Sequence, residues 1–113
     1  MSVSYFIRYD ISASDQDAFL RYYKDHHVGI LSRWPGLCRV VLHTPVEWSD
    51  AWPVNRGRAL LLVQLEFDSA EVLHAAFASP ERAEARADMA NFPPFEGRVT
   101  HQALASAEAW RRP

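Results

Sequence analysis

Several residue types are scarce in this chain of 113 residues, and each shortage excludes a class of protein. A single cysteine, Cys38, rules out a disulfide within the chain and fits a reducing compartment. The four glycines are scattered singly, so no glycine-rich loop could cradle the phosphates of a nucleotide cofactor. Lysines and arginines do not run together and the net charge is -2, which argues against nucleic acid as a partner.

Long apolar runs and metal-binding motifs are missing as well. No stretch approaches the roughly 20 residues that cross a membrane, and the N-terminal MSVSYFIRYD reaches charged residues too early for a signal peptide. There is no H-E-x-x-H and no Cys-His cluster, and the adjacent pair His26-His27 lacks the i, i+4 spacing that places two ligands on one helix face. We therefore expect a cytoplasmic protein that uses no metal and no cofactor, with no nucleic-acid or membrane partner.

The remaining composition is that of an ordinary globular protein. Hydrophobic residues make up 49% of the chain and charged residues 23%, and the length suits one domain over residues 1–113. β-Branched and aromatic runs predict strands over residues 3–9, 37–43, 59–67 and 97–104. Helices are predicted after a turn at 10–15 as far as Pro35-Gly36, and from an Asp68 cap to about residue 90 with a restart at Ser79-Pro80. The order β, α, β, β, α, β is that of α+β ferredoxin-like domains.

The first predicted helix carries the most informative pattern. Three- and four-residue spacing predicts one inward stripe, which comprises Phe19, Tyr22, Tyr23, His26, His27, Ile30 and Leu31. Tyrosine hydroxyls and imidazoles need partners once buried, so a stripe made only for packing would contain more aliphatic residues. This helix is therefore the best candidate for the wall of a ligand site, with His27 as a group that can move a proton near neutral pH and His26 nearer the rim.

Two further segments bear on assembly and ligand access. Strand 59–67, with the sequence ALLLVQLEF, is apolar on both faces for most of its length, which predicts that a second subunit covers the face that the helices leave open. The connection 44–58 is long and contains Trp48 and Trp52, which could fill a core edge, form a subunit contact or close over a ligand. Tyr5, Tyr22, Tyr23 and His43 are further candidates to line a site, whereas His74 and His101 are expected on outward faces.

The run YYKDHHVGILSRWPGL, followed later by FASPERAEARADMANF, resembles the EthD family of dimeric α/β barrel proteins. The matching parts of the first signature are Tyr23, His27 and the turn Pro35-Gly36-Leu37. The second signature, a short acidic helix that ends in aspartate and is followed by an aromatic residue, is matched by Asp88 and Phe92. Gly29 departs from the pattern, because the family more often has proline there.

The resemblance implies a four-stranded antiparallel sheet with helices on one face, and a homodimer in which two sheets form a barrel. It also implies a pocket between the helices and the sheet, with His27 and Asp88 as catalytic candidates. The substrate-binding candidates are Tyr23 and Phe92 from the two signatures, together with Tyr5, His43 and Trp52 from the reading of the chain. The residues alone favour a surface position for Asp88, on a charged helix beside Arg82 and Arg86, and only the resemblance favours a role in orienting His27.

Three functions are compatible with this pattern. The first is a cofactor-independent isomerase or cyclase of catabolism or secondary metabolism that acts on an apolar or aromatic small molecule through His27. The second is a non-catalytic small-molecule binding or accessory protein that works beside an oxidising enzyme. The third is a dimerisation module whose pocket is vestigial.

Overall fold

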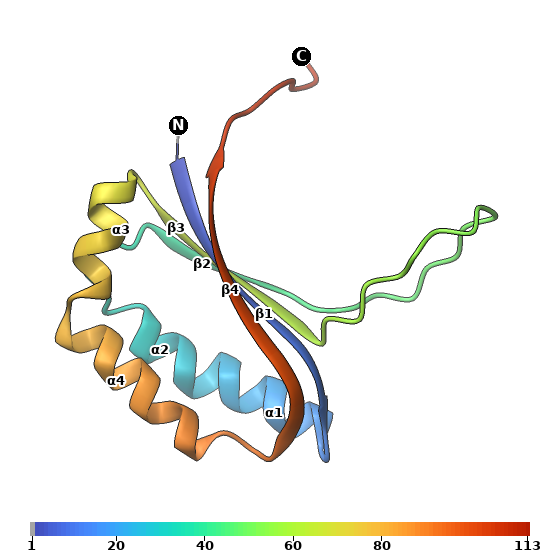
Figure 1. Ribbon diagram of the computed structural model, residues 1–113, viewed down its shortest axis with the longest axis horizontal. Helices are drawn as coiled ribbons and strands as arrows, with labels where there is room; N and C mark the ends of the chain where they lie inside the picture. The colour runs from blue at the N-terminus through green and yellow to red at the C-terminus, as the bar shows by residue number, and fades with distance from the viewer. Residues whose placement is uncertain (1) are drawn as a thin grey trace.

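The computed structural model describes residues 2–113 and contains a four-stranded antiparallel sheet with helices on one face (Figure 1). The strands are β1 (Ser2–Ala13), β2 (Arg39–His43), β3 (Leu61–Phe67) and β4 (Phe95–Ser106), in the spatial order β2-β3-β1-β4. The helical elements are α1 (Gln16–Tyr22), the π-turn η1 (Tyr23–His27), α2 (Val28–Leu31), α3 (Ala70–Phe77), α4 (Pro80–Asp88) and the 3-10 turn η2 (Met89–Asn91). This order confirms the predicted α+β, ferredoxin-like βαββαβ fold.

Side-chain caps set the starts of the longer helices. The Asp15 carboxylate accepts a hydrogen bond of 3.0 Å from the backbone of Ala18 at the start of α1. Ser79 caps α4 in the same way and Pro80 occupies its first position, which confirms the predicted restart. The cap of α3 is Ser69 rather than the predicted Asp68, because it is the Ser69 hydroxyl that accepts from the third backbone N–H of the helix.

The outer strands are longer than predicted because β1 and β4 pair along their whole length. The pairing runs from Ser2 opposite Ser106 to Ala13 opposite Phe95, so the predicted turn at 10–15 is mostly strand. Gly97 permits this close pairing: its φ is +129°, and a Cβ there would lie 2.4 Å from the carbonyl oxygen of Asp10. The β1–β4 pair is thereby extended toward the start of α1.

The main core lies between the helices and one face of the sheet. Alternate residues of β3 point into it, and Leu61, Val63, Leu65 and Phe67 are all buried. The helical side contributes Phe19, Tyr23, Leu31, Trp34, Leu73 and Ala76. The predicted inward stripe of the first helix is confirmed for four residues, since Phe19, Tyr23, His27 and Leu31 are buried. Tyr22 and Ile30 are half-buried and His26 is exposed.

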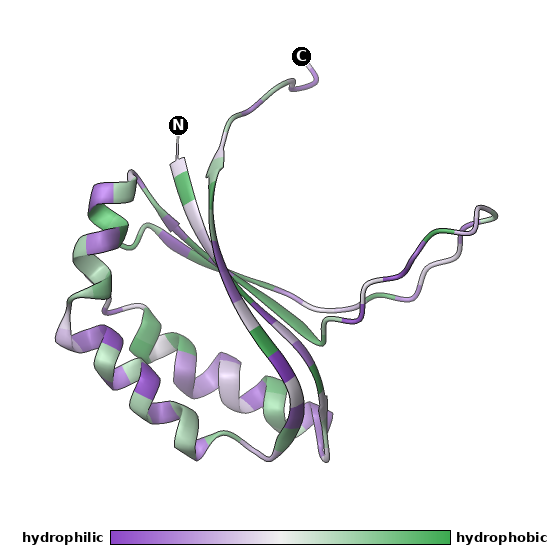
Figure 2. Cartoon of the chain, in the orientation of Figure 1, coloured by the Kyte–Doolittle hydropathy of each residue, from purple (hydrophilic) through white to green (hydrophobic). Residues whose placement is uncertain are grey.

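The second face of the sheet is more polar than predicted. It contains a chain of hydrogen bonds from His43 Nε2 to Gln64 Oε1 (3.1 Å) and from Gln64 Nε2 to Ser4 Oγ (3.1 Å). Apolar side chains share this face, because Phe6 pairs with Gln64 and Leu62 pairs with Arg8. Figure 2 shows that polar and apolar residues are mixed along the strands. The expectation of an apolar second face is therefore wrong for much of its area, since polar side chains on neighbouring strands satisfy one another there.

Residues 44–58 form an extended arm that projects from the end of β2 and β3, away from the helices (Figure 1). Trp52 is 77% exposed and Trp48 is 47% exposed, with the Arg56 guanidinium 3.8 Å from the centre of the Trp48 ring. The arm therefore does not fill the edge of this chain's own core, which was one of the predicted alternatives. The other two predicted roles for the arm are a subunit contact and a lid over a ligand.

Candidate functional site

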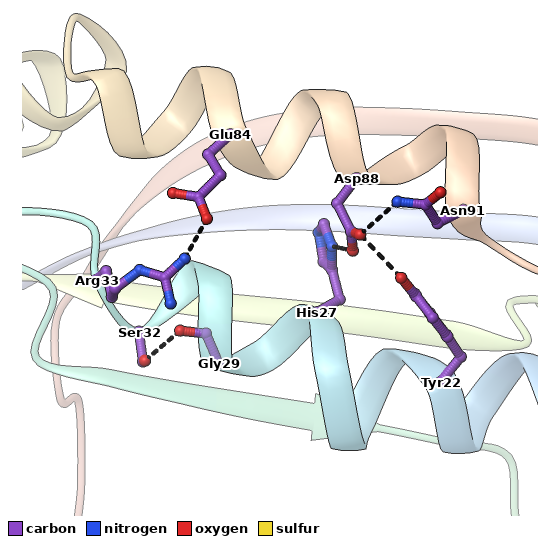
Figure 3. A network of polar contacts seen from close by, with 8 residues as sticks. All are labelled: Tyr22, His27, Gly29, Ser32, Arg33, Glu84, Asp88 and Asn91. Atoms are coloured by element: carbon purple, nitrogen blue, oxygen red, sulfur yellow. Dashed lines mark hydrogen bonds and ion pairs between the residues drawn. The ribbon is translucent and has the colours of Figure 1, made fainter.

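A buried carboxylate at the centre of the candidate site joins α4 to the first helical segment, α1 and η1. Asp88, at the end of α4, accepts hydrogen bonds from His27 Nδ1 (2.9 Å), the Tyr22 hydroxyl (2.8 Å) and Asn91 Nδ2 (3.1 Å), as Figure 3 shows. Burial alone would raise the pKa of Asp88, but these hydrogen bonds outweigh it and lower the pKa below its usual value. Asp88 is thus an ionised acceptor, and the surface position that its neighbours suggested is wrong.

The ionised carboxylate fixes the protonation state of His27. A carboxylate can only accept, so the ring proton of His27 is on Nδ1 and the lone pair is on Nε2. Burial lowers the pKa of His27, and the hydrogen bond to Asp88 opposes this shift only in part. The imidazole is therefore neutral at pH 7 and has its basic nitrogen turned away from Asp88.

His27 lies in the wall of a cavity of about 500 Å³ between the helices and the sheet. The size suits a small organic ligand. The cavity is lined by Tyr5, Ile7, Tyr9, His27, Leu31, Trp34, Arg82, Ala85, Arg86, Met89 and His101. Most of these side chains are apolar or aromatic, and burial raises the pKa of Tyr9 to about 12, so its hydroxyl stays protonated.

His101 lines this cavity although it was expected on an outward face. It pairs with Ile7 across the sheet, and its Nδ1 lies 2.6 Å from the hydroxyl of Tyr5. The alternation of β4 could have revealed this position, because Val99 and His101 share the face that points at the helices. Strand 97–104 is the weakest of the predicted strands, and its register was not apparent from the sequence.

The structure brings some of the other predicted residues to the site. Tyr5 lines the cavity. Tyr23 and Phe92 lie behind the catalytic candidate rather than in the cavity wall: each has its ring centre 4.8 Å from that of His27, and Phe92 is edge-on to it. Burial raises the pKa of Tyr23 well above its usual value, and its hydroxyl has no hydrogen-bond partner within residues 2–113.

Two predicted substrate-binding residues lie elsewhere in the chain. His43 is exposed at the end of β2, on the sheet face away from the helices, where it bonds to Gln64. Trp52 is in the projecting arm and does not line the cavity. Neither can touch a ligand in the cavity of its own chain, because alternation places His43 on the wrong face and the arm extends away from the helices.

The sequence profile of the EthD domain matches residues 12–94, a range that includes both His27 and Asp88. The chain belongs to the EthD family. A family relative, an uncharacterised 11.0 kDa protein of the thcB-thcC intergenic region of Rhodococcus erythropolis, is 35% identical over 79 residues, which cover 70% of this chain and 73% of the relative.

Solved structures share the fold of this EthD protein at low sequence identity. An EthD family protein from Bacillus halodurans is 19% identical with a TM-score of 0.72, covering 95% of this chain and 100% of the other. SnoaB from Streptomyces nogalater, a cofactor-independent oxygenase, is 12% identical with a TM-score of 0.63 and 98% coverage of both chains. A dimeric ferredoxin-like protein of unknown function from Thermobifida fusca is 11% identical with a TM-score of 0.63, covering 94% and 92%.

Within residues 2–113, no three His, Cys, Asp or Glu side chains are placed so that they could hold a metal ion together. Across the same residues, every helix is too short or too polar to cross a membrane.

Proposed function

We propose that this EthD protein is an enzyme that uses His27 as a general base on an apolar or aromatic small molecule, without a cofactor. The observation that carries the proposal is the arrangement of His27: its Nδ1 is held by the ionised Asp88, and its ring borders a cavity of about 500 Å³. A buried, neutral imidazole oriented by a carboxylate is the usual arrangement of a protein base that works near pH 7.

The proposed chemistry is a proton transfer within one substrate molecule. His27 Nε2 takes a proton from a carbon next to a carbonyl group, the C–H bond breaks, and its electron pair stays on the substrate as an enolate. Asp88 stabilises the imidazolium that forms. Return of the proton to another carbon completes an isomerisation, while attack of the enolate on a second carbonyl, followed by protonation of the alkoxide, completes a cyclisation. Both reactions balance without an external oxidant.

The cavity wall favours an apolar or aromatic substrate. Ile7, Tyr9, Leu31 and Trp34 provide flat and branched apolar surfaces, on which an aromatic ring can pack. SnoaB, described as a cofactor-independent oxygenase, shares this fold and so offers a precedent for chemistry in such a domain without a bound cofactor. We further infer that residues 1–113 act as one domain and form a homodimer, since dimeric proteins occur among the structures of this fold.

Hydrogen–deuterium exchange tests the base directly, before the full reaction is known. A panel of aromatic lactones and polyketide-like phenols is first screened for binding to the wild-type protein. Each bound compound is then incubated in D₂O, and exchange at its acidic C–H positions is followed by NMR. We expect His27→Ala to abolish the exchange, whereas the control His26→Ala, which changes the exposed neighbouring histidine, retains it.

Each outcome separates one of the three functions. Loss of exchange in His27→Ala alone supports the enzyme. Binding that survives His27→Ala, with neither exchange nor turnover by the wild type, supports the accessory binding protein and refutes the enzyme. A thermal stability that no compound in the panel changes supports a vestigial cavity.

A further inference from the structure

The cavity wall beside His27 has an excess of positive charge. Arg82 and Arg86 both line it, and none of its lining residues is an aspartate or a glutamate. The two arginines are four residues apart on α4, so they lie on the same side of the helix. A helix face made only for packing would have aliphatic residues at these positions, as it has Ala85 between them.

Neither guanidinium is neutralised within the described chain. Two of the carboxylates near them in sequence are engaged elsewhere: Glu84 pairs with Arg33, and Asp88 is taken up by His27, Tyr22 and Asn91. Glu81, next to Arg82 in the part of the chain that the structure describes, forms no ion pair with either arginine. No ion pair found in residues 2–113 includes Arg82 or Arg86. Arg82 is half-buried and Arg86 is more exposed. A half-buried guanidinium without a carboxylate is costly, and a planar anion is the ligand that best satisfies the fork of N–H donors that both side chains present.

The surroundings of Arg82 hold it at one end of the cavity. Its guanidinium carbon lies 4.4 Å from the centre of the Phe77 ring, and the Phe77 ring is edge-on to that of Tyr5 at 4.9 Å. The Tyr5 hydroxyl is in turn 2.6 Å from His101 Nδ1. Burial and the charge of Arg82 lower the pKa of His101, so its ring is neutral. In the tautomer whose Nδ1 accepts from Tyr5, Nε2 carries an N–H donor.

We propose that the ligand of this cavity carries a carboxylate, which Arg82 and Arg86 bind with the help of His101, while its apolar part occupies the space next to His27. This assignment rests on the proposed function and narrows its substrate class to aromatic or polycyclic carboxylates. The positive end of the cavity would also stabilise the negative charge that builds up when His27 removes a proton.

A matched pair of probes tests the assignment without knowledge of the natural substrate. Binding of 2-naphthoate and of the neutral 2-naphthamide, which have the same ring and nearly the same shape, is measured by calorimetry at pH 7. We expect the wild type to bind the carboxylate roughly tenfold or more tightly than the amide, as for a charge-assisted bidentate contact. Added salt should reduce this preference.

Variants locate the charge that is responsible. Arg82→Met and Arg86→Met keep the length of the side chain and should each weaken naphthoate binding roughly tenfold while leaving naphthamide binding nearly unchanged. Arg82→Lys retains the charge without the planar fork and should keep part of the preference. The control Lys24→Met removes one positive charge at an exposed position outside the cavity, and the preference should persist.

The outcomes distinguish this assignment from the proposed base. Equal affinities, tighter binding of the amide, binding of neither probe, or arginine variants that all behave like Lys24→Met would overturn the carboxylate site, even if His27 proves essential for proton exchange. A carboxylate preference that persists in His27→Ala and disappears in the arginine variants supports the site, even if proton exchange turns out to be independent of His27.

Discussion

Replacing Asp88 by asparagine tests the central geometry, because the two side chains have nearly the same shape. In the wild type, Oδ1 of Asp88 accepts from Tyr22 and Asn91, and Oδ2 accepts from His27. An asparagine can keep its carbonyl oxygen toward Tyr22 and Asn91, which places its NH₂ group against His27 Nδ1. The ring nitrogen must then accept, so the ring proton moves to Nε2 and the basic site facing the cavity is lost.

The loss of stability should be smaller than the loss of activity. Three hydrogen bonds to a charged acceptor become weaker bonds to a neutral amide, which we expect to cost about 1–3 kcal/mol in the free energy of unfolding. For a chain of this length that corresponds to a decrease in Tm of roughly 4–12 °C. Proton exchange or turnover should fall by a factor on the order of 10² to 10⁴, because the remaining tautomer cannot accept a proton at Nε2.

The assay is a ¹⁵N NMR spectrum of the histidines, recorded together with chemical denaturation. Asp88→Asn should move the His27 proton from Nδ1 to Nε2 and lower the pKa of His27 further, since Asp88 favours the charged ring. The control Asp25→Asn, an exposed carboxylate on the same helical segment, should change neither. A variant that keeps the Nδ1 proton and full activity would refute the role that we assign to Asp88.

The same variant has a defined pH dependence. The pKa of Asp88 is lowered in the folded state, so its contribution to stability is complete above its unfolded value of about 4 and is lost as the pH falls through the folded pKa. The difference in unfolding free energy between the wild type and Asp88→Asn should therefore be constant near neutral pH and should close in strong acid. The lower pKa of His27 in the variant adds to the difference between pH 6.5 and the folded pKa of His27, so the decisive range is strong acid: a difference that does not close there would contradict the hydrogen-bonded, ionised carboxylate.

Three further predictions concern His27, the glycines and the arm. Burial lowers the pKa of His27, so on acidification this histidine is protonated in the unfolded chain before it is protonated in the folded protein. The free energy of unfolding should therefore decrease as the pH falls below about 6.5, until the folded pKa of His27 is passed. In His27→Gln, denaturation measured across this pH range should lack this part of the decrease. Gly97→Ala should lower the free energy of unfolding by about 2 kcal/mol or more, because its Cβ would meet the backbone of Asp10. Gly29 has open space around it, so Gly29→Ala should raise the free energy of unfolding by roughly 0.5–1 kcal/mol. Thermal denaturation compares the two variants, and equal shifts in Tm would contradict this difference. If the exposed arm forms the subunit contact, Trp52→Ser should raise the dimer dissociation constant measured by analytical ultracentrifugation. An unchanged dissociation constant would exclude the subunit contact and favour the role of the arm as a lid over a ligand.

The order of elements was predictable because each signal is local. Ser79-Pro80 marks a helix start by its own chemistry, and the apolar run over 59–67 marks a strand. The extra length of β1 could not be read in this way, because residues 10–13 have turn-like composition and are held in the sheet only by their partners on β4. Tertiary pairing there overrides local propensity.

The site was predictable in part for the same reason. His27 could be found from its helix and from the family resemblance, but the burial of Asp88 depends on three donors that come from different turns and helices. Its neighbours Arg82 and Arg86 gave the sequence the appearance of a solvated helix. They line the cavity instead, so the feature that suggested a surface helix belongs to the site.

The spacing of the buried side chains explains why the helix that carries His27 contains a π-turn. Phe19, Tyr23, His27 and Leu31 are all buried and are four residues apart. In a regular α-helix each residue advances by about 100°, so a four-residue step overshoots a full turn by about 40° and three steps by about 120°. A stripe with this strict spacing would wind away from the sheet.

The π-turn η1 corrects for this rotation. Val28 N–H bonds to the carbonyl of Tyr23, five residues back, so this turn holds more residues than an α-turn and absorbs part of the overshoot. His27 consequently stays on the same side as Tyr23, where Asp88 and the cavity lie, and His26 is turned toward solvent. A pattern read with α-helical spacing gives a broad stripe that includes both histidines, whereas the wider turn selects one of them for the site.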